Sequence, residues 1–345
     1  MSGNKIYRLR DIKTFKDYER KLNMEINKIK NDSKWIWFNM LNMPDKYKRY
    51  IYERLGIEKI YNLEISREII LGEKYNEKNN LSKNELEDGV NKIIEKYKNE
   101  FLDNKKKDLA YEIASMLKSE NINLISIENK YFPKSLKLIY DYPLMFFAKG
   151  NLKLLKEEKI GIVGARMCSL YGINITRVIS KNLKNKGYVI VSGLAKGIDK
   201  SAHIAAEGRT IAVLGTGLNE EVFYPKENIN IYKDIIKKGG LVISEFMPNE
   251  SATKYTFPKR NRIIAGLSNS VIISEAKKKS GSLITAEFAM NEGKDVYTVP
   301  GDILSKKYDG NNELLRDGAI PIMSFDDLDM FFEDISSTDD RRKAV

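Results

Sequence analysis

The chain has 345 residues, of which 42% are hydrophobic and 31% charged, and this length and hydrophobic share allow two domains with packed cores. The single cysteine, Cys168, and the single histidine, His203, exclude an intrachain disulfide framework and a Cys/His zinc site. The formal net charge of +11 favours a polyanionic partner such as nucleic acid, unless the lysines are merely scattered over a solvated surface.

Residues 1–120 are rich in Lys, Glu, Asn and Tyr, and their apolar residues follow a helical period. In KWIWFNMLNM, Trp37, Met40 and Leu41 keep the i, i+3, i+4 spacing of one helix face. Further amphipathic helices are predicted over residues 47–57, with Gly56 as a stop signal, and over 85–102 and 108–122. We therefore expect a helical N-terminal domain.

After residue 120, short β-branched apolar runs alternate with helical segments. The predicted strands are 123–127, 159–164, 188–193, 210–215, 241–245, 270–275 and 295–300. The predicted helices are 171–187, 198–208, 228–240, 259–268 and 282–293. Apolar runs without alternation suit strands that are buried on both faces of a parallel sheet. We predict an α/β fold with a doubly wound, mostly parallel Rossmann-like sheet over residues 121–325, and a short tail over 326–345.

Glycines, cations and hydroxyl residues gather where these strands are predicted to end, which is the edge at which such sheets bind ligands. The stretch KIGIVGARMCSLYG, residues 159–172, has an arginine in its loop and lacks the glycine spacing of dinucleotide-binding loops. The candidate anion-binding residues at this edge are Gly164, Arg166, Ser169, Lys196, Gly215, Thr216, Gly217, Arg260, Asn261, Arg262, Ser280, Gly281, Ser282 and Thr285.

Two groups of cations are predicted at helix N-termini, where each positive charge costs about 0.3–1 kcal/mol. Arg260 and Arg262 are expected in the first turn of one helix, and Lys277–Lys279 directly precede another. An anion bound between these cations and the free backbone N–H groups would make the electrostatic free energy of the cations favourable instead of unfavourable. The alternative is an ion pair between Arg260 or Arg262 and a carboxylate such as Glu245 or Glu275.

Several other residues favour structural interpretations. We expect His203 to be packed in the interior, Cys168 to be an ordinary loop residue, and Phe257 to lie in the core rather than stack on a base. Lys196 is equally well explained as a solvated loop lysine. We predict no catalytic residue, no metal site and no cofactor.

The motifs IGIVGAR…YG, SGLAKGID…AH, TIAVLGTGL…YP, FPKRNRIIAGLS, SGSLITAEFA and VPG…GNNELLRDGA follow in this order. Together they closely resemble the DprA/Smf family, the DNA-processing protein A of natural transformation, over residues 122–325. WIWFNMLNMPDKYKRYIYERLG resembles the helical domain of that family, with a SAM-like part at about 34–70. Met43–Lys46 stands where many relatives have a glycine-rich hairpin, and the family's winged-helix domain is expected to be absent after residue 325.

The resemblance implies a cytoplasmic, non-enzymatic protein that binds single-stranded DNA, protects incoming strands and loads the RecA recombinase during natural transformation and recombination. It also implies a homodimer formed through the Rossmann-like domain and no association with membranes. Mapped onto this sequence, Arg166 would grip backbone phosphate, and the basic and polar residues of the later loops would assist it.

Two other function classes remain open. A nucleotide hydrolase of a related Rossmann-like family would use Thr285 and Glu287 of SGSLITAE, with Glu287 as acid or base on an N-glycosidic bond. The simpler interpretation of Glu287 is a first-turn residue favoured by the helix dipole. A protein-interaction platform without DNA binding is the third possibility.

Overall fold

The computed structural model describes residues 15–62, 85–333 and 335. The chain divides into two compact units, Met1–Glu120 and Asn121–Val345. The end of the predicted SAM-like part, 63–70, and the end of the predicted tail, 336–345, lie outside the described residues.

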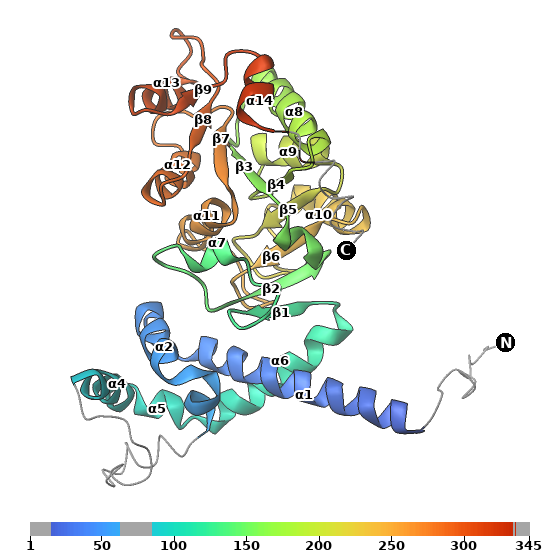
Figure 1. The fold of residues 1–345 in the computed structure, drawn as a ribbon, viewed down its shortest axis with the longest axis vertical. Coiled ribbons are helices and arrows are strands. Elements are labelled where there is room, and N and C mark those ends of the chain that lie inside the picture. Colours follow the sequence, from blue (N-terminus) through green and yellow to red (C-terminus); the bar gives the residue numbers. More distant parts are fainter. Residues whose placement is uncertain (1–14, 63–84, 334, 336–345) are drawn as a thin grey trace, which may run out of the picture. The chain divides into compact units, whose positions relative to one another are not determined.

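The first unit is helical, as the sequence predicts. Its described helices are α1 (Phe15–Met40), α2 (Asp45–Tyr61), α4 (Glu85–Lys96), α5 (Lys98–Phe101) and α6 (Asn104–Ser119), shown in blue to teal in Figure 1. Gly56 interrupts α2 with a φ of 70°, which agrees with its role as a stop signal. The stretch predicted as one helix over 85–102 is divided at Tyr97, whose φ of −112° is not helical.

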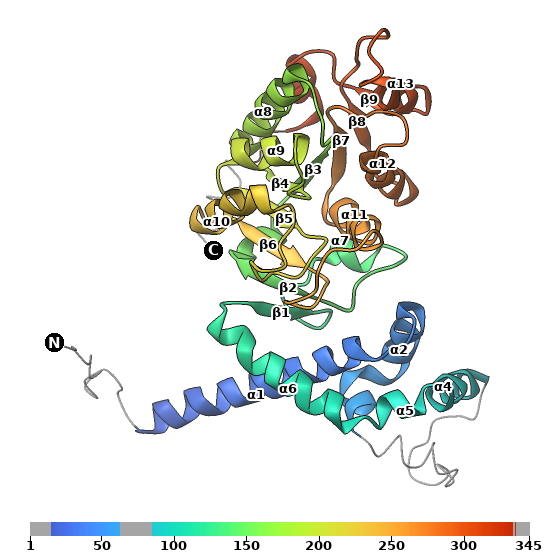
Figure 2. The same ribbon diagram turned by 180° about the vertical axis from the view of Figure 1, so that it is seen from behind.

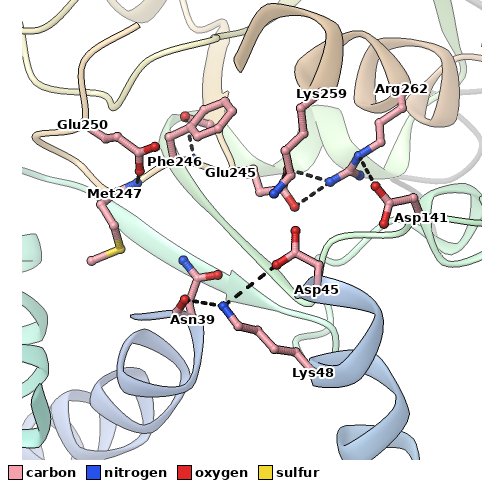
Figure 3. A network of polar contacts seen from close by, with 11 residues as sticks. Asn39, Asp45, Lys48, Asp141, Glu245, Phe246, Met247, Glu250, Lys259 and Arg262 are labelled. Atoms are coloured by element: carbon pink, nitrogen blue, oxygen red, sulfur yellow. Dashed lines mark hydrogen bonds and ion pairs between the residues drawn. The ribbon is translucent and has the colours of Figure 1, made fainter. Parts of the chain in front are cut away.

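Aromatic side chains fill the core of this unit. Trp37 and Leu41 are almost fully buried, as their spacing predicts, and Phe101 packs edge-on against Trp37 with ring centroids 6.1 Å apart. The ammonium of Lys48 donates to the carbonyl of Asn39 at 2.6 Å and ties the start of α2 to the end of α1 (Figure 3).

The second unit is built on a nine-stranded sheet with the order β1-β2-β6-β5-β4-β3-β7-β8-β9. The strands are β1 (Asn123–Ser126), β2 (Met145–Gly150), β3 (Lys159–Val163), β4 (Val189–Ser192), β5 (Thr210–Val213), β6 (Leu241–Ser244), β7 (Ser270–Ile273), β8 (Val296–Thr298) and β9 (Ile320–Pro321). The pairs from β6 through β9 are parallel, whereas β1–β2 and β2–β6 are antiparallel. The predicted α/β class with a mostly parallel sheet is confirmed.

Two of these strands, β2 and β9, were not predicted. Only four residues of β2, Met145–Ala148, are buried, and the strand is completed by its pairing with β6. The two residues of β9 are defined by their pairing with β8. The buried part of β2 is a run of four apolar residues, and β9 is only two residues long, so both lack the longer apolar run that marks the predicted strands.

Helices cover both faces of the sheet (Figures 1 and 2). One layer contains α8 (Leu170–Asn185), α9 (Ile198–Ala206), α10 (Ile229–Lys237) and α14 (Asp326–Phe331). The other contains α7 (Lys134–Lys137), α11 (Thr256–Leu267), α12 (Gly281–Asn291) and α13 (Asp309–Arg316). Two 3₁₀ turns, η2 (Leu152–Lys156) and η3 (Lys226–Asn228), complete the described elements of this unit.

The order of the strands places a switch point between β3 and β7. From β3 the chain proceeds through β4 and β5 to β6, and then returns to the other side of β3 as β7. The loops that leave β3 and β7 therefore diverge to opposite faces, and a crevice opens between them at the carboxyl ends of the strands.

The first described residues of the short tail predicted over 326–345 are packed against the rest of the second unit. Leu328 and Phe332 are buried, and the ring centroid of Phe332 lies 5.0 Å from that of Tyr297 on β8. The apolar residues of α14 belong to the main core, where they pack with Ile160 and Ile179.

His203 is packed in the interior, as predicted. Its Nδ1 lies 2.7 Å from Oγ1 of Thr210, whose hydroxyl donates its only proton to the carbonyl of Ile190 at 2.6 Å. Nδ1 therefore carries a proton and donates. Burial, reinforced by the charge of Arg260, lowers the pKa of His203 to about 3.

Ion pairs fix α11 on the sheet (Figure 3). The helix begins at Thr256, so Arg260 and Arg262 lie beyond its first turn and the expected conflict with the helix dipole does not arise there. Arg262 is 4% exposed, and its Nη2 lies 2.6 Å from Glu245 while its Nε lies 3.1 Å from Asp141. For Arg262, the structure thus shows the ion pair with Glu245 that the sequence offered as the alternative to anion binding.

We predict that replacing His203 with Asn removes part of the pH dependence of stability. The unfolded imidazole titrates near 6.5, so below that pH the unfolded state binds more protons than the folded state and stability falls as pH falls towards 3. The wild type should lose about 1.4 kcal/mol of unfolding free energy per pH unit below about pH 6 relative to the variant. Urea melts of both proteins at pH 7.5 and 5 measure this difference, and parallel pH profiles would contradict it.

We also predict that Arg262→Met lowers the free energy of unfolding by about 2–4 kcal/mol, because it removes the closest cation, at 2.6 Å, from the mostly buried carboxylate of Glu245 and leaves it the more distant Lys259 at 4.0 Å. Adding Glu245→Gln should restore part of the loss. Lys278→Ala is the matched control, since its 3.7 Å pair with Glu313 is exposed and worth about 0–1 kcal/mol. Equal losses in Arg262→Met and Lys278→Ala would refute this account.

Candidate nucleic-acid interface

A cleft of about 430 Å³ opens at the switch point, beyond the carboxyl ends of β3 and β7. Its walls come from the turn after β3, from α11 and from the segment that leads into α12. The sequence-predicted residues that line it are Gly164, Arg166, Arg260, Asn261, Ser280, Gly281, Ser282 and Thr285. Residues from three separate loops thus meet in one place, as the strand-end argument requires.

Arg166 is an exposed cation in the lining of this cleft. Its guanidinium carbon lies 5.2 Å from the ring centroid of Phe257, a cation–π contact. Phe257 is half-buried and lines the cleft, so it is not the core residue that the sequence favoured. A small adjoining hollow, between Arg166 and Lys196, is bordered by Phe257 and Tyr224, whose rings are 5.9 Å apart.

The glycines after β5 make room for these groups. A Cβ at Gly215 would lie 2.8 Å from the ring of Phe257, and one at Gly217 would lie 2.1 Å from the carbonyl oxygen of Pro248. Thr216 between them is fully buried. The structure places all three behind the cleft rather than in its lining, where they permit close packing.

An internal carboxylate occupies the N-terminus of α8. Ser169 caps this helix by accepting from the N–H of Gly172 at 3.0 Å. The N–H of Ser169 donates to the carboxylate of Glu275 at 3.0 Å, and its hydroxyl donates to the same group at 2.5 Å. A Cβ at Gly172 would lie 2.2 Å from Oε2 of Glu275, so the glycine gives the carboxylate its space.

This arrangement changes the interpretation of the loop after β3. In a dinucleotide-binding fold the pyrophosphate lies at the N-terminus of the first helix. Here Glu275 supplies the negative charge at that position, so a phosphate would meet both steric and electrostatic repulsion. Arg166 points instead to the cleft that it lines.

The loop after β4 is organised by Asp199. This buried carboxylate accepts the N–H groups of Gly193 at 3.1 Å and Ala195 at 3.4 Å. Burial raises its pKa, and the charge of Arg260 opposes that shift. Lys196, by contrast, is about half exposed and pairs with Glu227 at 2.5 Å, which raises the pKa of the lysine. Lys196 borders the small hollow beside Arg166 and does not line the main cleft.

Arg260 lies at the back of the cleft. It is 4% exposed, and its Nη1 donates to the carbonyl of Val213 at 2.6 Å. A Cβ at Gly193 would lie 1.8 Å from this nitrogen, so the glycine is required for the arginine to fit. Burial lowers the pKa of Arg260 to about 10, partly offset by Asp199. Its charge contributes to the field of the cleft; Nη1 is bonded to Val213, whereas the buried Nε has no hydrogen-bond partner among the described residues.

The start of α12 forms the opposite wall. The helix begins at Gly281 with Ser280 as N-cap, and exposed Lys277–Lys279 precede it, so the predicted placement of these cations is confirmed. Asn261 donates to the carbonyl of Gly281 at 3.0 Å and joins this wall to α11. The N–H of Ser282 donates to the N-cap hydroxyl of Ser280 at 3.4 Å, and the positive end of the helix dipole with the nearby hydroxyls suits an anion.

Sequence reasoning did not foresee the roles of the two acids that shape this region: it considered Glu275 only as an ion-pair partner of Arg260 or Arg262 and did not single out Asp199. Glu275 is the last residue of the strand predicted at 270–275, and Asp199 lies in the first turn of α9. An acid at each of these strand-end loops was a visible signal. Neither the space at Gly172 nor the turn of backbone around Asp199 could be read from the sequence.

Another hollow, of about 460 Å³, lies at the amino ends of the strands. Its lining includes the acids Glu157, Glu158 and Asp295 with Arg209 as the cation. Arg209 is itself ion-paired with Glu157 at 2.5 Å. An anionic ligand is therefore favoured at the cleft around Arg166 and disfavoured here.

Over the described ranges, the structure contains no helix with the length and apolar character needed to cross a membrane.

Comparison with known proteins connects this geometry to one family. Residues 123–333 match the family described as DNA recombination-mediator protein A. DNA processing protein DprA of Streptococcus pneumoniae (strain ATCC BAA-255 / R6) is 50% identical over 211 residues, which cover 60% of this chain and 73% of that protein.

Two solved structures are similar. The crystal structure of DNA processing protein A from Streptococcus pneumoniae has a TM-score of 0.60 at 40% identity, covering 83% of this chain and 97% of that one. A structure of DNA processing protein A from Helicobacter pylori, described by its single-stranded DNA binding mode, has a TM-score of 0.55 at 32% identity over 60% of this chain and 94% of that one. The matched segment contains the whole cleft around Arg166, and the chain belongs to the DprA/Smf family of DNA recombination-mediator proteins.

Proposed function

We propose that this protein binds single-stranded DNA in the cleft around Arg166. The observation that carries the proposal is the meeting of exposed cations, Arg166 and Lys277–Lys279, with the N-terminus of α12 in one open cleft. The relative from Helicobacter pylori, whose structure is described by its single-stranded DNA binding mode, supports it.

The cleft favours a strand over a free nucleotide. The position that would hold a nucleotide's pyrophosphate, at the start of α8, is filled by Glu275. The remaining cations are spread across two walls of the cleft, which suits successive phosphates of a polymer. Contacts to phosphate carry little sequence information, so binding should be nearly independent of base sequence.

From the family resemblance we further propose protection of incoming strands and loading of RecA during natural transformation, in the cytoplasm. Dimerisation through the Rossmann-like unit belongs to the same proposal. We propose that the protein performs these roles as a binding protein rather than as an enzyme.

The hydrolase alternative receives no support from the geometry. Glu287 is the seventh residue of α12, not a first-turn residue as the sequence analysis assumed, and it is exposed. It does not contribute to the lining of the cleft. Thr285 does line the cleft, but no acid of the described chain stands beside it there except buried Asp199.

The decisive measurement is binding of labelled single strands and duplexes over a range of salt concentrations. Wild-type protein should prefer the single strand, and its affinity should fall steeply with salt because bound counterions are released. Arg166→Ala should weaken binding and reduce the slope of log K against log salt by about 0.7, the value for one phosphate contact on a single strand.

Arg177→Ala is the matched control, because Arg177 is exposed on α8 and lies outside the cleft. It should leave affinity and slope close to the wild-type values. The proposal would be refuted if the wild type did not bind single strands, or if Arg166→Ala and Arg177→Ala changed the affinity equally.

Incubation with nucleoside monophosphates tests the enzymatic alternative. We expect no release of free base above the background rate, with either the wild type or Glu287→Gln, because Glu287 does not face the cleft. Turnover by the wild type that disappears in Glu287→Gln would establish the hydrolase instead.

A further inference from the structure

We propose that Glu275 is a positioning residue for Arg166: it fixes the turn that carries the arginine and thereby sets the affinity for single-stranded DNA. The inference rests on the proposed function, since it concerns the same cleft. Glu275 itself is fully buried and is not expected to touch the ligand.

Both ends of the Arg166 turn are bound to this one residue. The N–H of Ala165, directly before Arg166, donates to the backbone carbonyl of Glu275 at 2.7 Å. At the other end, the N–H and the hydroxyl of Ser169 donate to its carboxylate at 3.0 and 2.5 Å. The three residues between these anchors, Arg166–Cys168, bridge two points on a single amino acid.

Tyr308 completes the set of donors. Its hydroxyl donates to Oε2 of Glu275 at 3.0 Å, and the oxygens of Tyr308 and Ser169 are 3.1 Å apart. Each hydroxyl has one proton and both protons are directed at the carboxylate. The Ser169 oxygen still accepts from the N–H of Gly172 at 3.0 Å, so every group in this network has a consistent role.

An acid is favoured at position 275 because its charged carboxylate accepts stronger hydrogen bonds than a neutral side chain would. A buried carboxylate needs several donors, and it finds them in Ser169, Tyr308 and the positive end of α8. In return it forms the stronger, charge-assisted bonds that a neutral side chain would not form. The turn is thus held in one conformation before DNA arrives, which lowers the entropic cost of fixing Arg166 on binding.

Two glycines leave the space that Glu275 needs beside the turn. A Cβ at Gly164 would lie 2.8 Å from the carbonyl oxygen of Glu275, and one at Gly172 would lie 2.2 Å from its Oε2. Glycines therefore flank the turn on both sides where Glu275 approaches. The glycines of the stretch 159–172 therefore leave space for the internal carboxylate of Glu275 as well as for the cleft.

The test compares Glu275→Gln and Tyr308→Phe with the wild type. Gln keeps the shape but loses the charge, and Phe removes only one hydroxyl. Each should weaken single-strand binding, Glu275→Gln by about tenfold, by analogy with the smaller effects of removing the hydrogen-bond partner of a metal ligand. The slope of log K against log salt should stay at the wild-type value, because no phosphate contact is lost.

A double-mutant cycle with Arg166→Ala isolates the mechanism. If Glu275 acts through Arg166, Glu275→Gln should have little further effect once the arginine is gone. Full additivity, with tenfold weakening in both backgrounds, would overturn the proposal. Tyr232→Phe is the matched control: it removes a buried hydroxyl that donates to the carbonyl of Leu218 at 2.7 Å, outside the cleft, and should leave DNA affinity unchanged.

Hydrogen exchange provides a readout that does not need DNA. The amides of Ala165 and Ser169, which both donate to Glu275, should exchange faster in Glu275→Gln than in the wild type, whereas Arg166→Ala and Tyr232→Phe should leave them protected. Unchanged exchange in Glu275→Gln would refute the positioning role. If Arg166→Ala binds DNA as well as the wild type, the proposed function fails, while faster exchange in Glu275→Gln would still show that Glu275 holds the turn.

Discussion

The cleft depends on the constraint that the parallel strands β3, β4 and β7 all end at one edge of the sheet. Because β7 returns to the far side of β3, the loops that follow these two strands separate and leave an opening between them. Arg166, the buried Arg260 and the start of α12 are far apart in sequence, yet this topology brings them to one site. Without the switch in strand order the same loops would not face one another.

Negative charge inside the protein organises the positive charge at its surface. Glu275 binds the turn that carries Arg166, and Asp199 binds the loop that carries Lys196. Both acids are buried and accept backbone N–H groups that would otherwise have no partner. The cations they support are exposed, so the geometry of the cleft is fixed from behind while its charge stays available in front.

The arginines of FPKRNR show how one motif serves two purposes. Arg262 holds α11 to the sheet through Glu245 and Asp141, whereas Arg260 is inserted behind the cleft and donates to Val213. Neither has the exposure of Arg166. The exposed lysines before α12 are better placed to meet a strand that enters the cleft, because long flexible ammonium groups follow a moving phosphate more easily than a wedged guanidinium.

The sequence by itself determined the fold class, most strands of the parallel sheet, the starts of α8 and α12, and the family. These features are local, because apolar runs, capping residues and ordered motifs can each be recognised within a short segment of sequence. It also indicated that cations gather at one edge of the sheet. Only the tertiary structure decided which of them are exposed, because burial depends on what distant elements pack against.

That distinction accounts for the residues whose surroundings the sequence did not foresee. Phe257 borders the cleft because Gly215, in the loop after β5, leaves room for its ring. Arg260 is buried because Gly193 admits it. Glu275 fills the position that the glycine-rich stretch 159–172 suggested for a phosphate, and it comes from the segment after β7, more than one hundred residues away along the chain. A local sequence pattern can indicate an anion-binding position, but only the packed structure shows that the carboxylate of Glu275 occupies it.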